Sequence, residues 1–286
     1  MSNRKTYRLV AGKRDAVFVD SVPREVATAW LERPERLFEH GPNWTDGSPA
    51  RTTRVSSPVG DLFVKEQRRK LHRAILDALV GRPTAASRAF TTGLTLAAAR
   101  VNAARPVGLI QRRLLGESYL LLEFVDARDL RQHLIEGLAL RENGTRTEDA
   151  DAFKSALWKS LGQSVADLHA ARVRQRDLKA PNILINDDRS AGPRTVFVDL
   201  EGMERLRVAP SRAQRQRDLA RLAASLRASA VREAGVTDDD WRRVLQAYFE
   251  ARGAKDDDEI DRFFAETLAW AERKEDRNRR EGRSVL

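Results

Sequence analysis

The pattern of apolar and polar positions changes character about 125 residues into the chain. In the first part, short stretches of β-branched and aromatic residues are interrupted by Gly and Pro, which is typical of β-strands. Ser56–Asp61 predicts a tight turn between two strands, because Pro58 and Gly60 supply the dihedral angles that a chain reversal needs. The strand-forming stretches are residues 7–10, 16–22, 52–67 and 118–127, and the helical ones are 24–38, closed by Pro34, 71–80, and 84–102, capped by Thr84.

After residue 125 the apolar residues recur every three or four positions, which is the spacing of amphipathic helices. Only two short strands are predicted there, at 182–186 and 195–200. The sequence therefore predicts an α+β protein with a strand-rich part, a mostly helical part and a charged, frayed tail, with bounds at 1–125, 126–272 and 273–286. The helices predicted in the second part are 129–140, 151–173, 215–230, 238–253 and 258–275.

Composition narrows the class of protein. The chain has 286 residues with 41% apolar and 33% charged positions, which is enough to bury a core. Its net charge of +10 favours an anionic partner such as a nucleotide or an acidic membrane surface. There is no cysteine, no secretory signal and no apolar run of the roughly 20 residues that a membrane span needs. We therefore expect a cytoplasmic protein, with peripheral contact to the inner membrane surface as an open option.

Four polar residues around the two short strands carry the candidate chemistry. Asp199 ends an apolar strand, where a carboxylate is costly unless it meets a cation or hydrogen-bond donors. The oxygens of Asn182 and Asp199 are hard ligands of the kind that magnesium accepts. Asp177 follows a helix and could orient a hydroxyl group and take its proton, while Lys179 could neutralise a phosphoryl group in transfer. Taken singly, each residue is also an ordinary turn or cap residue.

Together, in this order, the four residues resemble the catalytic segment of the protein-kinase-like fold, an Asp-x-x-x-x-Asn loop followed by an Asp-led glycine turn. The resemblance implies a bilobal fold that uses ATP and Mg²⁺. It assigns Lys65 to the ATP phosphates, with an exposed strand lysine as the alternative. It also assigns adenine recognition to the backbone groups of Glu123 and Val125, and this assignment rests only on their position in the strand that links the two lobes.

The chain is most similar to the bacterial lipopolysaccharide inner-core kinases, the family of Kdo and heptose kinases. The fragments that carry the likeness are VFVDLEGM at 196–203, RDLARL at 217–222 and VLQAYFEA at 244–251. This resemblance implies ATP-dependent phosphorylation of a sugar hydroxyl on a lipid-linked or small sugar acceptor at the inner face of the membrane.

Three departures from the family pattern affect the prediction. Gln175 stands where most members carry His, and we expect it to hydrogen-bond in place of that ring. No acidic residue occurs between Thr84 and Gln111, and Ala89 takes the place of the helix Glu that would pair with Lys65. Either Asp77 or Glu66 would have to replace that Glu, or Lys65 lacks such a partner.

The third departure concerns the loop that covers the phosphates. A Gly-x-Gly-x-x-Gly motif is absent, so this loop would be residues 45–50 with Gly47 as its one glycine. Its backbone N–H groups could still cradle phosphate, although Pro49 removes one donor.

Other functions remain open at this stage. A small-molecule phosphotransferase usually has His at the Lys179 position, and a protein kinase needs a longer segment than 203–217 before the helix of Asp218. A non-catalytic nucleotide-binding pseudokinase scaffold is motivated by the missing helix Glu. Nucleic-acid binding is disfavoured because the Arg-rich runs contain acids and lack aromatic residues.

Two further residues have expected structural roles. Asp218 is expected near a helix start, as either a plain cap carboxylate or an acceptor for catalytic-loop N–H groups. His169 is expected to be a packing residue.

Overall fold

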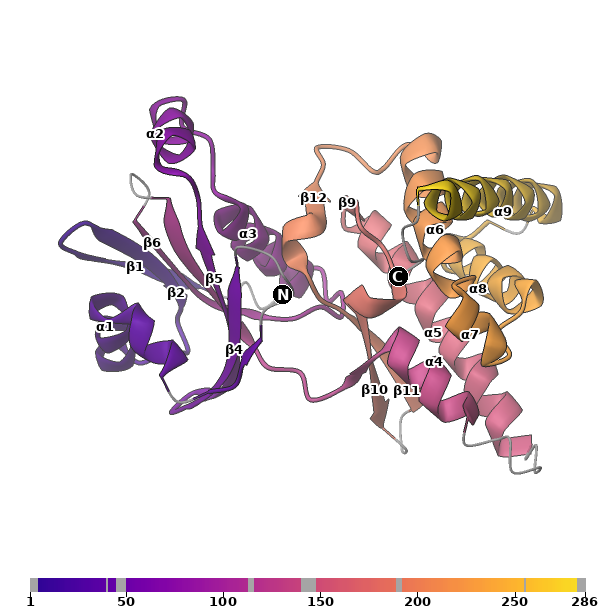
Figure 1. Ribbon diagram of the computed structural model, residues 1–286, viewed down its shortest axis with the longest axis horizontal. Coiled ribbons are helices and arrows are strands. Elements are labelled where there is room, and N and C mark those ends of the chain that lie inside the picture. The colour runs from indigo at the N-terminus through magenta and orange to yellow at the C-terminus, as the bar shows by residue number, and fades with distance from the viewer. Residues whose placement is uncertain are drawn as a thin grey trace. The chain divides into compact units, whose positions relative to one another are not determined.

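The computed structural model describes residues 5–39, 41–44, 50–112, 116–139, 148–188, 192–254 and 256–281. The chain forms two compact units, Met1–Val125 and Asp126–Leu286, called unit 1 and unit 2 below. Figure 1 shows the helices and strands of both units.

Unit 1 is built on a seven-stranded antiparallel sheet with the strand order β1-β2-β6-β7-β5-β4-β3. The predicted turn at Ser56–Asp61 is present, because β4 and β5 form a hairpin in which Ser57 pairs with Gly60. The strands are β1 (Thr6–Ala11), β2 (Arg14–Val19), β3 (Asn43–Trp44), β4 (Arg51–Ser57), β5 (Gly60–Arg68), β6 (Pro106–Arg112) and β7 (Glu117–Glu123).

Alternation along the strands directs side chains to two faces of the sheet. On one face Leu62, Val64 and Tyr119 join the core beneath α1 (Arg24–Glu32) and the 3₁₀ turn η1 (Pro34–Phe38). As predicted, the helix in this stretch ends before Pro34, because proline cannot continue the hydrogen-bond ladder.

A second helix, α3 (Ala85–Ala98), packs against β6 and β7 on the other side of the sheet from α1 (Figure 1). The predicted cap is confirmed, since Thr84 Oγ1 accepts from the Ser87 N–H at 3.0 Å. Between β5 and α3 lies α2 (Leu71–Leu79).

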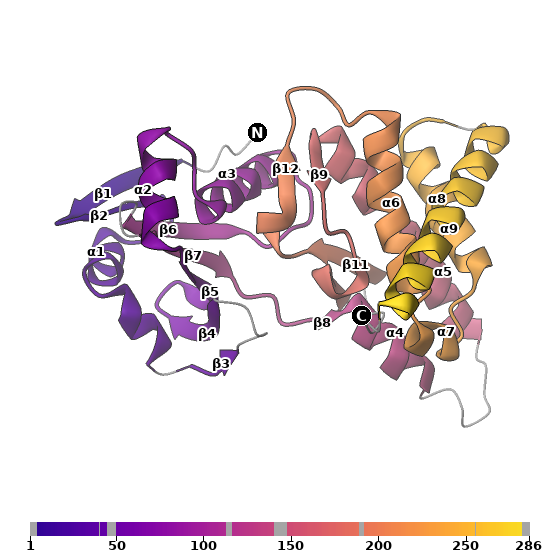
Figure 2. The same ribbon diagram turned by 45° about the horizontal axis from the view of Figure 1, so that its top comes forward.

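Unit 2 is mostly helical. The long helix α5 packs against α8, and α9 lies beside both α6 and α8 (Figures 1 and 2). Trp158, Tyr248, Phe249 and Phe263 are fully buried between these helices and form much of the core. The helices are α4 (Leu130–Ala139), α5 (Glu148–Ala170), α6 (Arg212–Leu226), α7 (Ser229–Glu233), α8 (Asp238–Ala251) and α9 (Asp257–Arg280).

The strands of unit 2 form two small sheets, β11-β10-β8 and β12-β9. The two predicted strands correspond to β10 (Ile183–Asp188) and β11 (Gly192–Phe197). Three further strands were missed: β8 (Arg128–Asp129), β9 (Val173–Gln175) and β12 (Met203–Arg205). Runs of two or three residues are too short to show a periodicity, so pairing across the chain defines them.

Two expectations for the C-terminal part differ from the structure. The segment from residue 273, expected to be a frayed tail, continues α9 as far as Arg280, because Ala271 and neighbouring side chains pack along α6. Asp218 lies inside α6 and not near its start, since Ser211 caps that helix through a capping box with Gln214. No helix in the described ranges is long and apolar enough to cross a membrane.

Candidate active site

The loop between β9 and β10 brings three of the predicted residues together. Lys179 Nζ lies 2.9 Å from Asp177 Oδ2, and about half of each side chain is exposed. Asn182 Nδ2 donates to the Asp177 carbonyl oxygen at 2.9 Å and approaches Asp177 Oδ2 at 3.4 Å. The 3₁₀ turn η3 (Ala180–Asn182) makes this possible by folding the chain back within five residues. An exposed carboxylate is thus held between an ammonium and an amide, ready to meet a hydroxyl group.

Gln175 links this loop to the second carboxylate. Its Nε2 donates to the Asp199 carbonyl oxygen at 3.1 Å, and its Oε1 accepts from the Asp177 N–H at 3.2 Å. The amide therefore joins the two turns that carry Asp177 and Asp199, as expected for the residue that replaces His. A Cβ at Gly202 would lie 2.4 Å from Gln175 Oε1, so any larger residue there would have to displace the Gln175 amide from this bridge.

Asp199 has an unusual backbone. Its φ of 53° and ψ of 57° lie in the left-handed region, which costs an L-residue roughly 1–2 kcal/mol. In the described part of the chain only Arg100 and Arg172 are also non-glycine residues with positive φ. Such strain persists only where the surroundings over-determine it, and it is common at functional sites. It turns the chain from β11 into η4 (Leu200–Gly202) immediately at the carboxylate.

Asn182 and Asp199 fit a magnesium ion in their chemistry. Because Asn182 Nδ2 is committed to Asp177, the amide oxygen Oδ1 is the atom left for a metal. The Asn182 carbonyl oxygen accepts from the Val198 N–H at 3.0 Å, which places the loop directly beside the strand that ends at Asp199. One carboxylate and one amide are a sparse set, and the described residues contain no group of three or more His, Cys, Asp or Glu side chains placed for a metal. Such a set suits Mg²⁺, because this ion usually binds one or two protein ligands and takes its other ligands from water and from the phosphates of a nucleotide.

Helix α6 braces the loop through two residues. The fully buried Asp218 carboxylate accepts from Arg174 Nη2 at 3.1 Å, and Ser225 Oγ accepts from the Ala180 N–H at 2.8 Å. Asp218 thus holds the loop through the guanidinium of Arg174, not as a cap carboxylate. Sequence reasoning missed Arg174 and Ser225, because their roles depend on the docking of α6.

His169 is a packing residue, as expected. The ring is fully buried, with Nδ1 3.0 Å from the Tyr248 hydroxyl and Nε2 3.5 Å from Asp218 Oδ2. Burial lowers the pKa of His169 below its ordinary 6.5, although the Asp218 carboxylate opposes this shift. The imidazole is therefore neutral at pH 7 and part of the support beneath the loop.

Two further cations lie near Asp177. Burial lowers the pKa of the half-buried Lys274 of α9, and the Asp177 carboxylate opposes that shift while Arg221 and Lys179 reinforce it. Arg221 of α6 lies 3.5 Å from Asp218, and burial lowers its pKa as well. The Asp177 carboxylate thus interacts electrostatically with Lys274 and Arg221 as well as with Lys179. The sequence analysis missed the interaction with Lys274 because Lys274 was assigned to the frayed tail.

In unit 1, Lys65 occupies β5, where it pairs with Thr52 of β4 and Leu120 of β7. Glu66 points to the opposite face, towards α1 and η1, because successive strand residues alternate. It is 2% exposed and binds Arg68 Nε at 2.7 Å and Arg51 Nη1 at 3.4 Å. Glu66 is thus committed elsewhere and does not replace the helix Glu, and Ala89 is fully buried on α3. The side chain of Asp77 lies outside the described part.

Two other residues predicted to bind the nucleotide, Glu123 and Val125, lie at the end of unit 1. Glu123 is the last residue of β7, and its N–H donates to the Arg105 carbonyl oxygen at 2.8 Å. Any contribution of Glu123 to adenine binding would therefore use its carbonyl oxygen. Val125 ends the unit. Gly47 lies outside the described residues.

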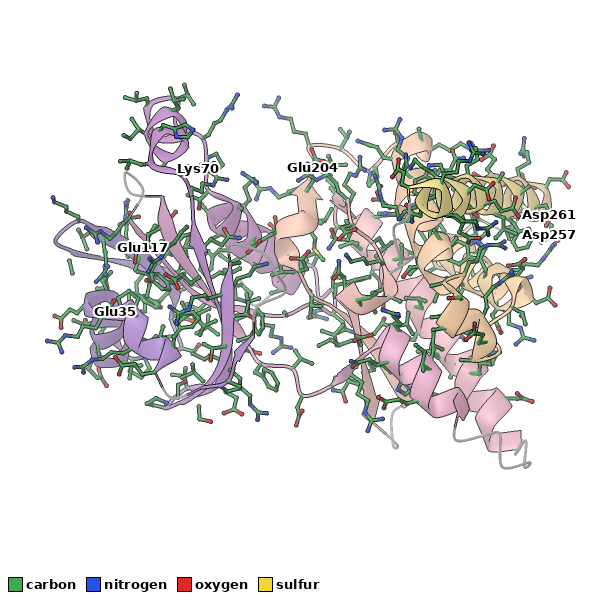
Figure 3. The ribbon with its side chains drawn as sticks, viewed as in Figure 1. Glu35, Lys70, Glu117, Glu204, Asp257 and Asp261 are labelled. Atoms are coloured by element: carbon green, nitrogen blue, oxygen red, sulfur yellow. The ribbon has the colours of Figure 1, made fainter. Side chains whose placement is uncertain are left out.

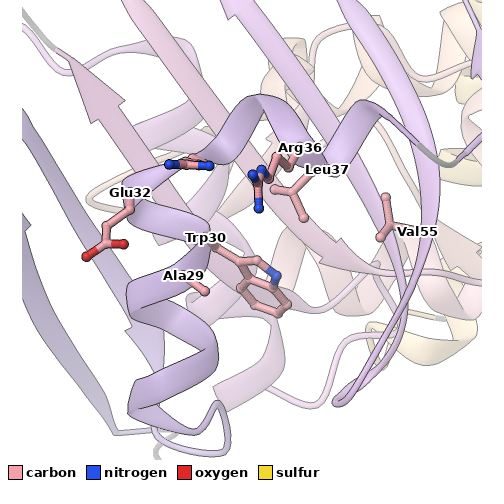
Figure 4. Close-up of a pocket in the computed structure, with 7 residues that line it drawn as sticks. Ala29, Trp30, Glu32, Arg36, Leu37 and Val55 are labelled. Atoms are coloured by element: carbon pink, nitrogen blue, oxygen red, sulfur yellow. The ribbon is translucent and has the colours of Figure 1, made fainter.

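A hollow of about 390 Å³ opens on the surface of unit 1 between α1, η1 and β4 (Figure 4). It lies on the α1 side of the sheet, the side away from Lys65. None of the candidate residues borders it. Its lining consists of Ala29, Trp30, Glu32, Arg33, Arg36, Leu37 and Val55.

Comparison with known proteins identifies the chain. The model of the lipopolysaccharide kinase (Kdo/WaaP) family matches residues 29–248, a range that includes the whole Asp177–Gly202 region. The protein belongs to this family. It is therefore a phosphotransferase that acts on a sugar hydroxyl of the lipopolysaccharide core, and kinase activity implies the use of ATP.

A solved structure described as "WaaP in complex with acyl carrier protein" superimposes with a TM-score of 0.66. It is 24% identical, and the match covers 92% of this chain and 98% of that one. This likeness confirms the predicted kinase fold, with its antiparallel sheet followed by a helical part. No curated protein sequence matches this chain significantly.

Proposed function

We propose that the kinase transfers the ATP γ-phosphoryl group to an inner-core sugar, Kdo or heptose, with Asp177 at the centre of the reaction. The observation that carries this proposal is the arrangement around Asp177: an exposed carboxylate fixed by Lys179, Asn182 and the Gln175 bridge to Asp199. Exposure leaves it accessible to an acceptor hydroxyl, and the hydrogen bonds fix its direction.

Each residue has a chemical role in this proposal. Asp177 accepts a hydrogen bond from the acceptor hydroxyl, orients its oxygen and takes its proton as the new O–P bond forms. Lys179 offsets negative charge on the transferring group. Asn182 and Asp199 would hold Mg²⁺, which when bound would neutralise negative charge on the phosphate oxygens. Lys65 holds the α- and β-phosphates.

The charges around Asp177 favour an anionic acceptor. Lys274 and Arg221 add positive charge beside the Asp177–Lys179 pair, where the acceptor hydroxyl must lie. A core sugar that carries carboxylate or phosphate groups would be attracted by this cluster, whereas a neutral sugar would gain nothing from it. We propose that the natural acceptor is lipid-linked and is reached through peripheral contact with the inner membrane surface, which would make the kinase a cytoplasmic enzyme.

The test is ATP turnover by the full chain with Mg²⁺, with and without extracted lipopolysaccharide core. Stimulation by the core should fall by roughly 10²-fold or more in Asp177→Ala. The matched control Asp257→Ala removes an exposed carboxylate of the same unit, at the start of α9, and should keep full turnover (Figure 3).

The pseudokinase scaffold is the competing function, favoured by the absence of an acidic residue on α3 and by the orientation of Glu66. It predicts nucleotide binding without phosphorylated core, in the wild type and in Asp177→Ala alike. A protein kinase is disfavoured because only residues 203–217 separate Gly202 from Asp218. Phosphorylation of added protein and not of core would reverse that preference.

A further inference from the structure

The helix α2 of unit 1 presents an unusual surface. It carries four large apolar side chains that are exposed to solvent, and Val80 directly after it is a fifth, out of seven such side chains in the described residues. A soluble protein scatters exposed apolar residues singly, whereas a contiguous group marks an interaction surface. The five are Leu71 at 54% exposure, Ile75 at 40%, Leu76 at 60%, Leu79 at 78% and Val80 at 67%.

These side chains form a continuous stripe. Leu71, Ile75 and Leu79 follow one another at intervals of four residues, as do Leu76 and Val80, and such positions lie on one face of a helix. The helix is attached to the sheet by a small contact, because Ala74 is buried against the turn at Gly116. In the described chain α2 has only marginal contact with other elements and projects from the sheet (Figure 1). The apolar stripe is therefore not covered by the core of unit 1.

Positive charge borders the stripe. Between residues 67 and 111 the chain has eight Arg and Lys residues against a single acidic one, Asp77. Lys70 lies where β5 leads into α2 and is exposed (Figure 3), and the side chain of Arg68 is 68% exposed. Arg82 and Arg88 are exposed just beyond the helix. An apolar helix face with a basic border complements an anionic lipid surface, which offers acyl chains below and phosphate groups above.

We propose that α2 is an interfacial helix that docks the kinase on an anionic bilayer. Leu76 and Leu79 enter the boundary between headgroups and acyl chains, and Lys70 and Arg82 contact lipid phosphates. The interaction goes beyond phosphoryl transfer and holds without nucleotide or acceptor. It would bring the enzyme to the surface in which a lipid-linked sugar is embedded.

The experiment uses the complete chain and vesicles of phosphatidylethanolamine with phosphatidylglycerol, beside vesicles of phosphatidylcholine alone. The wild type should sediment with the anionic vesicles, and less so at high salt. Leu76→Glu and Leu79→Glu should each lower the partition coefficient by roughly tenfold or more. Val208→Glu is the matched control, because Val208 is 71% exposed and lies in unit 2, and it should bind like the wild type.

A second measurement reports insertion directly. The chain has no cysteine, so Leu79→Cys and Val208→Cys each give one labelling site for an environment-sensitive dye. A blue shift with anionic vesicles at position 79 and none at position 208 supports the proposal, even if the Glu variants fold poorly. An unshifted dye at position 79, or undiminished sedimentation of folded Leu79→Glu, would overturn it.

Two controls separate other outcomes. If the wild type is a dimer in solution and Leu79→Glu a monomer, α2 is a self-association surface and the lipid proposal is wrong. Asp177→Ala should bind vesicles as the wild type does, so a failed kinase assay and a failed docking assay are distinguishable.

Discussion

The two units hold their candidate residues in different ways. In unit 2 the Asp177 loop is tied at several points, through Gln175 to Asp199 and through Arg174 and Ser225 to α6. In unit 1 Lys65 lies on a regular strand beside a helix without any carboxylate. Several hydrogen bonds therefore fix the loop proposed for phosphoryl transfer. The residues proposed to bind the nucleotide, in contrast, match the family pattern only in part. We expect mutations to show this difference.

The largest effect should come from Asp199. Asp199→Ala and Asp199→Gly should both lower kcat by roughly 10³-fold, because either change removes a carboxylate proposed to bind the metal. The two variants should differ in stability. Gly adopts a φ of 53° without strain. In urea titrations the free energy of unfolding of Asp199→Gly should therefore be about 1 kcal/mol larger than that of Asp199→Ala. Equal stability of the two variants would contradict the left-handed backbone.

The second prediction compares neighbours on β5. Lys65→Met should lower kcat/KM for ATP by roughly 10²-fold and leave the melting temperature unchanged. Glu66→Gln should lower the melting temperature and leave kcat/KM for ATP unchanged, because the buried carboxylate binds Arg68 and Arg51 on the other face of the sheet. Steady-state kinetics and thermal denaturation of both variants check this. A kinetic defect in Glu66→Gln as large as that of Lys65→Met would mean that Glu66 serves the nucleotide site after all.

The third prediction tests the bridge between the two carboxylates. Gln175→Ala removes hydrogen bonds to the Asp177 N–H and the Asp199 carbonyl oxygen. Turnover should fall by roughly tenfold or more through misplacement, and the free energy of unfolding by about 1–3 kcal/mol. Gln175→His should recover most of both, because a neutral imidazole also has one donor and one acceptor. Full activity in Gln175→Ala would show that the bridge is dispensable.

A smaller effect is expected at the cation cluster. Lys274→Gln should raise KM for lipopolysaccharide core by about fivefold while KM for ATP stays constant, because an exposed or half-buried charge contributes modestly. Arg279→Gln is the control on the same helix, since that side chain is 81% exposed. A change in KM for ATP would assign Lys274 to the nucleotide instead of the acceptor.

The smallest effect concerns pH. Burial lowers the pKa of His169 below 6.5, so the unfolded chain binds its proton first as pH falls. The free energy of unfolding should therefore decrease as pH falls below about 6.5, until the pKa of the folded state is reached. Arg252 and Arg215 strengthen the shift and Asp218 weakens it. Urea titrations from pH 7.5 to 5 should show a shallower loss for His169→Gln, and a parallel loss in both proteins would contradict the prediction.

Local patterns determined much of the fold. The strands β1, β2, β4, β5 and β7 of unit 1, the cap at Thr84 and the two long strands of unit 2 were predictable, because periodicity and turn chemistry act over a few neighbouring residues. The order and spacing of Asp177, Lys179, Asn182 and Asp199 likewise indicated the chemistry. The lobe bounds at 125 and 272, and the roles of Glu123, Val125 and Gly47, stay predictions.

Contacts between distant segments decided the rest. Asp218 binds Arg174 from inside α6, Lys274 interacts with Asp177 from the end of α9 that was expected to be a frayed tail, and Glu66 is held by Arg51 from the next strand. Leu79 has the helical spacing of a core residue and yet is 78% exposed. The sequence by itself determined which residues could do chemistry and which segments were regular. Only tertiary structure decided which side chains meet and which apolar face stays uncovered, because burial depends on partners that local sequence does not name.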